Sequence, residues 1–204
     1  GRARQVQRFT TLTIRDARGL KLKVKNIQNV ASLYSRRATV VYGNTRTRTS
    51  IQGVEPSAFQ IWRVSAKIGK LYDALDEKKI SRVCVLGYSA YKNLFLEQNP
   101  IKEIIKINNV PFQVIGVAQE RGQDLSGEDQ DDIIYVPLQS AIKRIFYVNF
   151  LDSIILQLKN PSEKEETIEE VRSFLRKNHR LREGKEDDFT IQDQAQLLEA
   201  EIQT

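Results

Sequence analysis

A serine follows a short apolar segment in the sequence RVCVLGYSAYKNLF, residues 82–95. A strand, a tight turn and a helix around a serine form the nucleophile elbow of hydrolases, in which the serine attacks an acyl carbon. The elbow requires Gly-x-Ser-x-Gly. Gly87 and Ser89 match it, but Tyr91 stands where the second glycine is needed. A polar residue at a helix start, with Gly87 easing the turn, explains the same residues without chemistry.

A serine nucleophile also needs a base, and an acid that orients the base. Asp152 and His179 would complete the order Ser, Asp, His, and His179 is the only histidine. His179 lies in RKNHRLRE at the end of an expected helix, where a cation interacts favourably with the helix dipole. No His-Gly-Gly segment that could form an oxyanion hole occurs in the sequence. A small serine hydrolase using Ser89 is therefore the alternative, and we expect Ser89 to be structural.

The segment GQDLSGEDQDD, residues 122–132, is rich in acidic side chains. Its acids do not follow the order of an EF-hand calcium loop, and a solvated loop with aspartates that cap turns is the simpler interpretation. Because long exposed loops often carry binding sites, we expect this loop to contact a partner. The partner-contact candidates are its polar residues: Asp124, Glu128, Asp129, Gln130, Asp131 and Asp132.

Other common chemistries find little support in the residues. One cysteine and one histidine cannot form a zinc site, and no Gly-x-x-x-x-Gly-Lys phosphate loop is present. Arg46 and Arg48 share one face of an expected strand, but Tyr42 alone offers little of the aromatic stacking that nucleic-acid readers use. We therefore expect no catalytic residue, no metal, no cofactor and no nucleic-acid partner.

Composition predicts a folded chain. Of 204 residues, 40% are hydrophobic and 28% are charged, and the formal net charge is +6. Cys84 lies between two valines and is expected to be buried. The chain begins Gly-Arg-Ala-Arg and has no methionine, so we expect a segment of a longer protein, with a basic lead-in at residues 1–10. No apolar run reaches the roughly 20 residues that span a bilayer.

Local patterns predict a mixture of strands and helices. The expected elements are a helix capped by Thr13 and Asp16, a hairpin at 32–53 turning at Gly43-Asn44, an irregular connector at 54–73, a strand at 82–86, a helix at 88–97, two strands around an Asn108-Asn109 turn, a strand at 132–138, a short helix at 139–146, a strand at 151–159, a helix capped by Ser162 and Glu165, a strand at 186–193 and an amphipathic helix at 194–204. This order predicts an α+β fold with one unit inserted in another.

Several phrases occur in a characteristic order: TLTIRDARGL, VVYGNTRTRTSIQGVEPSAF, RVCVLGYSAYKNLFLEQNPIKEIIKINNVPFQVIGV, DQDDIIYVPLQSAIKRIF and LDSIILQL. Together they resemble the extracytoplasmic domain of MacB-type ABC transporter permeases over residues 11–200. One departure is Lys102, where the family usually has glycine after the Pro-Ile pair.

The resemblance implies a porter-like βαβ subdomain built from residues 1–60 and 131–204, and an inserted, mostly β sabre subdomain at residues 61–130. It implies a noncatalytic domain between two transmembrane helices of a permease, at the periplasmic face of the bacterial inner membrane. ATP would be hydrolysed in a separate cytoplasmic domain. Expected partners are the permease's own transmembrane helices, a second permease copy, and a periplasmic adaptor or a lipoprotein carrier. Macrolides, peptide toxins, lipopeptides and lipoproteins stay open as substrates.

Overall fold

The computed structural model describes residues 12–194 and 197–203. The strands in these ranges are β1 (Ile27–Tyr42), β2 (Thr45–Val54), β3 (Ala66–Gly69), β4 (Val83–Leu86), β5 (Ile104–Ile107), β6 (Val110–Ala118), β7 (Ile133–Pro137), β8 (Ser153–Leu158), β9 (Phe189–Gln194) and β10 (Leu197–Ile202). The helices are α1 (Ile14–Lys23), α2 (Ser57–Trp62), α3 (Ala74–Lys79), α4 (Tyr88–Phe95), α5 (Leu138–Ser140), the π-helix η1 (Ala141–Ile145), the 3₁₀ helix η2 (Pro161–Glu163) and α6 (Lys164–Asn178).

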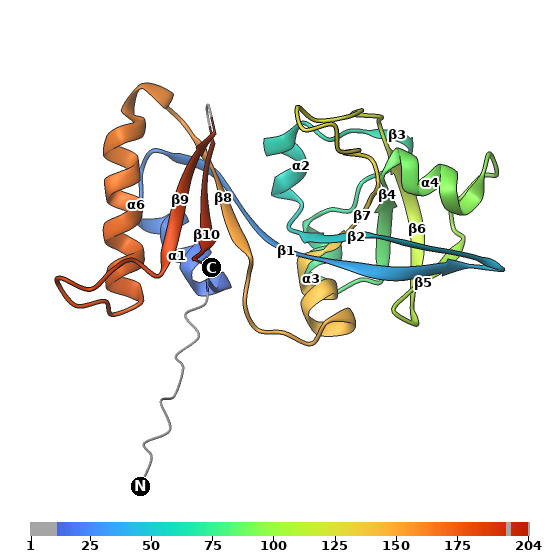
Figure 1. Cartoon of the computed structure of the whole chain (residues 1–204), viewed down its shortest axis with the longest axis horizontal. Coiled ribbons are helices and arrows are strands. Elements are labelled where there is room, and N and C mark those ends of the chain that lie inside the picture. Colours follow the sequence, from blue (N-terminus) through green and yellow to red (C-terminus); the bar gives the residue numbers. More distant parts are fainter. Residues whose placement is uncertain (1–11, 195–196, 204) are drawn as a thin grey trace, which may run out of the picture.

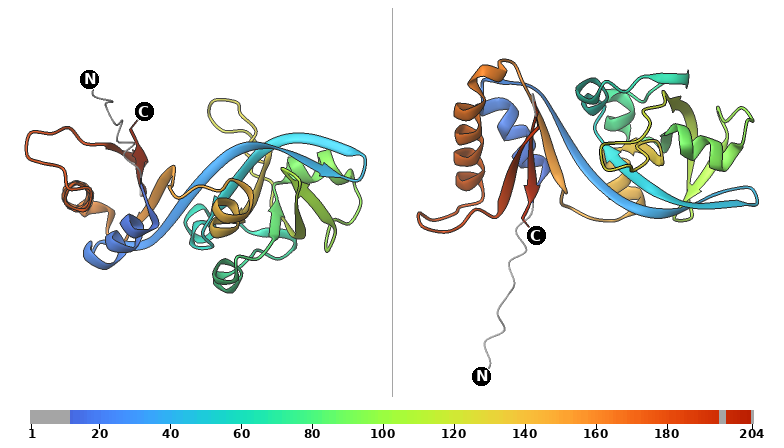
Figure 2. Two further views of the ribbon diagram at one scale, coloured as in Figure 1. Left: turned by 90° about the horizontal axis from the view of Figure 1, so that it is seen from below. Right: turned by 45° about the horizontal axis from the view of Figure 1, so that its top comes forward.

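The molecule has two lobes, and the long strand β1 runs through both of them (Figure 1). In one lobe, which we call the sheet lobe, the first half of β1 pairs with β8, and β10 and then β9 follow β8 in the sheet. In the other, the barrel lobe, the second half of β1 pairs with β2 and β5. Figure 2 shows the same division from two further directions. The predicted α+β class is confirmed, and the expected subdomain boundaries at residues 61 and 131 stay a prediction.

The barrel lobe is a closed ring of strands. Its order is β1, β2, β7, β4, β6 and β5, and β5 returns to β1 through the pairs Val40–Ile107 and Val41–Lys106. Each strand of this ring pairs with a neighbour on both sides for at least part of its length, and the interior is filled by apolar side chains. Cys84 belongs to this core and is buried, as the sequence predicts. Burial also raises the pKa of its thiol, so Cys84 is chemically inert in the folded protein.

The sheet lobe packs α1 and α6 against its apolar core. Thr13 and Asp16 form the predicted capping box at the start of α1. Leu20 of α1 and both Val171 and Leu175 of α6 are buried in the same cluster as Leu156 and other residues of the sheet. This spacing of three to four residues on the helices is what places their apolar faces on the sheet.

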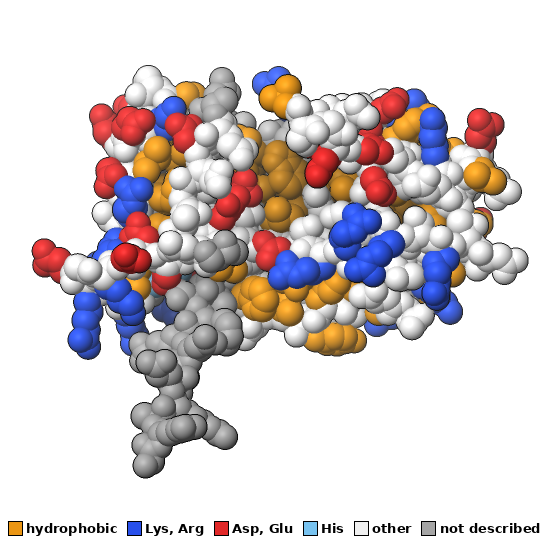
Figure 3. Space-filling model, in the orientation of Figure 1, with side chains coloured by type: hydrophobic (Ala, Val, Ile, Leu, Met, Phe, Trp, Pro, Cys, Tyr) orange, Lys and Arg blue, Asp and Glu red, His pale blue; other side chains and the backbone are white. Residues whose placement is uncertain are grey.

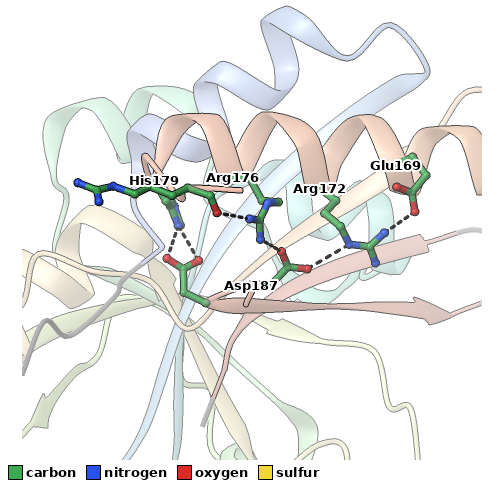
Figure 4. A network of polar contacts seen from close by, with 7 residues as sticks. Glu169, Arg172, Arg176, His179 and Asp187 are labelled. Atoms are coloured by element: carbon green, nitrogen blue, oxygen red, sulfur yellow. Dashed lines mark hydrogen bonds and ion pairs between the residues drawn. The ribbon is translucent and has the colours of Figure 1, made fainter. Parts of the chain in front are cut away.

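An ionic cluster joins the two helices of the sheet lobe to β9. Nε2 of His179, at the end of α6, lies 2.8 Å from Oδ2 of Asp16 on α1. Its Nδ1 lies 2.8 Å from Oδ1 of Asp188, directly before β9. Nearby, Asp187 accepts hydrogen bonds from Arg172 and Arg176 of α6 (Figure 4). Carboxylates on both sides of the imidazole therefore tie three elements together.

The same geometry fixes the charge of the imidazole. The hydrogen bond with Asp16 and then that with Asp188 raise the pKa of His179 to about 9, against the opposing effect of burial. Burial raises the pKa of Asp16, but hydrogen bonds from His179 and Asn178 outweigh it and leave that pKa lowered. Both partners are thus charged near neutral pH, as a paired buried ion requires.

Some predicted elements are confirmed and others are wrong. The hairpin turn at Gly43-Asn44, the turn at Asn108-Asn109 and the helix that begins at Tyr88 occur as predicted. The final amphipathic helix is wrong, because residues 197–202 form β10 between β8 and β9. The alternation of buried Leu198 and Ala200 with glutamates is a period of two, which suits a strand.

Three further predictions need correction. The capping box of Ser162 and Glu165 is wrong: Asn160 accepts the N–H of Ser162, and α6 begins only after the turn η2. The connector at 54–73 is partly regular, since it contains α2 and β3. The short helix predicted at 139–146 is α5 continued by the π-helix η1. The expected basic lead-in at residues 1–10 lies outside the described residues.

The His179 cluster predicts a specific pH dependence of stability. Because the folded pKa is raised to about 9, the contribution is fully present below the unfolded pKa of 6.5 and is lost as the pH rises through 9. We expect urea unfolding to show a loss on the order of 2–3 kcal/mol in the free energy of unfolding between pH 6 and pH 9.5. His179→Gln should be less stable at pH 6 and should lack this step. A parent protein whose stability is flat across that range would contradict the assignment.

Candidate functional site

The residues of the hypothetical serine triad do not meet. Oγ of Ser89, in the first turn of α4, donates a hydrogen bond to Oδ2 of Asp129 at 2.5 Å. Both ring nitrogens of His179 face Asp16 and Asp188 in the sheet lobe. The carboxylate of Asp152 accepts hydrogen bonds from the N–H of Ser35 and the guanidinium of Arg36. The arrangement of base, acid and nucleophile that acyl transfer requires is therefore not assembled from these three side chains.

The need for glycine at position 87 is steric and unrelated to catalysis. A Cβ atom at this position would lie 2.3 Å from the carbonyl oxygen of Asp131 and 2.7 Å from that of Ile133. The N–H of Gly87 donates to the carbonyl of Ile133 at 2.8 Å, and the N–H of Ala90 donates to that of Asp131. The glycine thus lets the end of the acidic loop lie directly against the start of α4. Ser89 serves the same contact through Asp129.

The acidic loop between β6 and β7 is built around Asp131. This side chain is buried, and its two carboxylate oxygens accept the backbone N–H groups of Arg121 and Gly122 at 2.9–3.1 Å. Backbone hydrogen bonds from Gln130 to Gly122 and from Asp124 to Glu128 close the loop further. A buried carboxylate that satisfies several N–H groups is costly to remove, so Asp131 holds the two ends of the loop together.

The other five partner-contact candidates differ in what their side chains do. Asp124 accepts the N–H groups of Ser126 and Glu128 through Oδ1, and the hydrogen bond with Ser126 is the main reason that its pKa is lowered. Asp132 accepts the hydroxyl of Thr49 at 2.7 Å. Asp129 accepts the hydroxyl of Ser89. These acids shape the loop from within.

Two candidates have side chains without hydrogen-bond partners among the described residues. Within the described residues, the side chains of Glu128 and Gln130 make no hydrogen bond, and Glu128 is exposed. Leu125, at the tip of the loop, is fully exposed, which sequence reasoning missed. The sequence signal that could have revealed this exposure is the position of a single leucine within a segment of acids and glycines. Contact of this loop with a partner stays a prediction, and these three residues are the ones whose side chains are free to make it.

The loop also borders a cleft of about 610 Å³. Its opposite wall is the surface of β1 and β2, where Arg37 and Gln52 lie, and Trp62 at the end of α2 forms one side. Arg121 reaches across and donates to the carbonyl oxygen of Trp62 at 3.4 Å. In Figure 3 acidic side chains lie above basic ones on this face of the barrel lobe, with hydrophobic side chains recessed between them. Such a surface offers both charge signs to a polar partner.

Residues 12–194 and 197–203 contain neither a metal-binding cluster nor a helix that could span a membrane. No group of three or more His, Cys, Asp or Glu side chains converges there in a way that could hold a metal ion. None of the helices in those ranges has the length and apolar character needed to cross a bilayer.

The described features define a two-lobed α+β domain whose long polar loop, rather than an assembled catalytic centre, is its candidate site. The chain matches the family model described as MacB-like periplasmic core domain over residues 1–174, and it belongs to that family. The predicted resemblance to MacB-type permeases is thus confirmed.

Named relatives agree with this membership. The chain is 31% identical over 198 residues to the macrolide export ATP-binding/permease protein MacB of Bdellovibrio bacteriovorus, which covers 95% of this chain and 30% of that protein. It is 31% identical over 194 residues to the protein of the same name from Chlorobium luteolum, covering 95% of this chain and 28% of that protein. The chain therefore spans less than one third of the length of these curated relatives.

Solved structures show the same fold. The extracellular domain of the noncanonic ABC-type transporter YknZ from Gram-positive bacteria superposes with a TM-score of 0.76 at 21% identity, covering 85% of this chain and 87% of that one. The periplasmic region of MacB from Actinobacillus actinomycetemcomitans gives a TM-score of 0.75 at 23% identity, covering 97% of this chain and 82% of that one.

Matched substitutions can test whether buried Asp131, and not exposed Glu128, stabilises the loop. Asp131→Asn removes the charge that binds two backbone N–H groups, and we expect a loss of about 1–3 kcal/mol in the free energy of unfolding. Glu128→Gln removes the same charge from an exposed side chain and should change stability by less than about 0.5 kcal/mol. Urea unfolding of both variants measures the difference. Equal effects would show that Asp131 does not hold the loop.

Proposed function

We propose that this chain is the extracytoplasmic domain of an ABC exporter permease, and that it transmits motion between the membrane part of that permease and a partner outside the membrane. Its family and the printed names of its relatives, export ATP-binding/permease proteins, support this proposal. So does its length, because it corresponds to one part of those longer proteins. In this proposal ATP is hydrolysed elsewhere, and the domain has no catalytic residue and no cofactor of its own.

The observation that carries the proposal is the convergence of both ends of the described chain on one point. Near the first described residue, Leu151 donates its N–H to the carbonyl of Leu12 at 2.8 Å. Near the last, the N–H of Ile202 donates to the carbonyl of Asp152 at 3.3 Å. The N–H of Asp152 in turn donates to the carbonyl of Leu33 in β1 at 2.9 Å. A displacement of either chain end therefore acts on the same place in β1.

From this place β1 leads directly into the barrel lobe. It pairs with β8 up to Leu33 and with β5 from Val40, so the residues between belong to the link between the lobes. A shared apolar cluster stiffens the link: Ala31 and Ile155 of the sheet lobe pack with Phe59 of α2. Packed elements of this kind move as units, so the barrel lobe would follow a movement at the chain ends.

The acidic loop is the part of the barrel lobe that we assign to the partner. A periplasmic adaptor protein or a lipoprotein carrier fits the family, and Glu128, Gln130 and Leu125 offer both polar and apolar contacts. The location that follows is the extracytoplasmic face of the bacterial inner membrane. The permease's own transmembrane helices and a second permease copy would be the other neighbours.

Cysteine accessibility tests location and partner contact together. Cys84 is buried, so it contributes little background to thiol labelling. In the full-length permease, Asn44→Cys at the exposed hairpin tip should react with a membrane-impermeant maleimide in intact spheroplasts. Reaction only after lysis would contradict the extracytoplasmic location.

Glu128→Cys reports on the partner in the same experiment. It should react rapidly in the purified permease and at least several-fold more slowly in spheroplasts that contain the native partners, because bound protein excludes the reagent. Asn44→Cys is the matched control and should react alike in both. Equal rates for Glu128→Cys in the two preparations would sink the partner assignment and leave the location standing.

A further inference from the structure

A second cleft, of about 560 Å³, lies beside the two ends of the described chain. One wall is α1, with Ile14 exposing part of its side chain. The other is the segment after η1, where Val148 and Phe150 are also only partly buried. Apolar side chains thus remain accessible on both sides. Figure 3 shows hydrophobic side chains at the lower surface of the molecule between the two lobes.

Three cations surround these apolar walls. Arg15 and Arg18 stand on α1, and Lys143 stands on η1 across the cleft. All three are exposed, and among the described residues none of them forms an ion pair or a side-chain hydrogen bond. The described residues that line the cleft include no acidic side chain. Unpaired cations around an apolar slot complement a ligand with an anionic head and an apolar body.

The segment that borders the cleft also presents an aromatic ring. Tyr147 is 78% exposed and has a φ of 54°, a left-handed conformation that is strained for an aromatic residue. The N–H of Val148 donates to the carbonyl of Ile142 at 3.0 Å, which holds this turn in place. Tyrosine with neighbouring lysine and arginine is the combination that sits at the level of lipid headgroups.

The position of the cleft indicates where its ligand comes from. Thr13 and Leu151 line it, and Leu12 and Leu151 form the bridge at which the described chain starts. In the proposed function, the chain ends lead to the membrane part of the permease, so the cleft faces the bilayer. The inference rests on the proposed function for this step alone.

We propose that this cleft binds an anionic membrane phospholipid, with Arg15, Arg18 and Lys143 around the headgroup and Ile14, Val148 and Phe150 against the acyl region. The bound lipid would hold the base of the domain at the membrane surface. A protein partner is a weaker fit, because the charged side chains among the described lining residues are of one sign only.

Vesicle binding of the 204-residue chain tests the proposal. We expect cosedimentation with phosphatidylglycerol vesicles and little with phosphatidylcholine vesicles. Removing two cations near an anionic surface should weaken binding more than tenfold, so Arg15→Gln with Arg18→Gln should lose most of it. Arg46→Gln with Arg48→Gln makes the same change in net charge on the far hairpin, where both arginines are exposed, and should change binding less than about threefold.

A further variant separates the cleft from general surface charge. Val148→Ser keeps every cation and reduces the apolar wall, so we expect it to weaken binding several-fold. Because Val148 also packs against the core, urea unfolding must show that the variant is folded under the conditions of the binding assay. Equal binding to both lipids, equal losses from the two arginine pairs, or full binding by Val148→Ser would each overturn the proposal. None of these outcomes touches the cysteine-accessibility result, so failure here is distinguishable from failure of the proposed function.

Discussion

The rest of the structure depends on the carboxylate of Asp152. The strand β8 stops pairing with β1 at Leu33, and one edge of β1 then has no strand beside it until β5 begins at Val40. At this gap Oδ2 of Asp152 accepts the N–H of Ser35 at 2.8 Å, which extends the ladder by one bond beyond its last strand pair. The guanidinium of Arg36 binds both carboxylate oxygens and stacks over Tyr34 at 4.3 Å from the ring centroid. A charged hydrogen bond thus holds the main chain at the point where one lobe becomes the other.

In the proposed function, this junction would let two lobes of different architecture move together. The barrel lobe is a closed ring of strands, whereas the sheet lobe, within the described residues, ends at the unpaired edge of β9 and is held by helices and the His179 cluster. Both ends of the described chain attach beside Asp152, at the boundary between the lobes. In the proposed function, motion that enters at these ends would reach the loop through β1 and the apolar cluster around Phe59. The lipid proposed for the second cleft would fix the other side of the same boundary.

The sequence predicted those structural features that depend on residues close together in the chain. The box of Thr13 and Asp16 and the turn at Asn108-Asn109 follow from neighbours a few residues apart, so both were predictable. The strand β10 was not, because its Leu and Ala residues fit a helix until β8 and β9 supply partners on both sides. The acidic loop was located from composition, but its sequence does not distinguish buried Asp131 from exposed Glu128. Asp152 was considered only as a catalytic acid, since its true partners, Ser35 and Arg36, lie more than a hundred residues away.

The most direct test of this account is the distance distribution between the lobes, measured with spin labels at Asn44 in the barrel lobe and Glu183 in the sheet lobe. In the parent chain the distribution should be narrow. Asp152→Ala leaves the N–H of Ser35 without its acceptor and frees Arg36, so the distribution should broaden while the domain stays folded. Asp193→Ala, which removes a carboxylate paired with Lys164 within the sheet lobe, should leave the distribution narrow. An unchanged distribution in Asp152→Ala would contradict the claim that this carboxylate joins the two lobes.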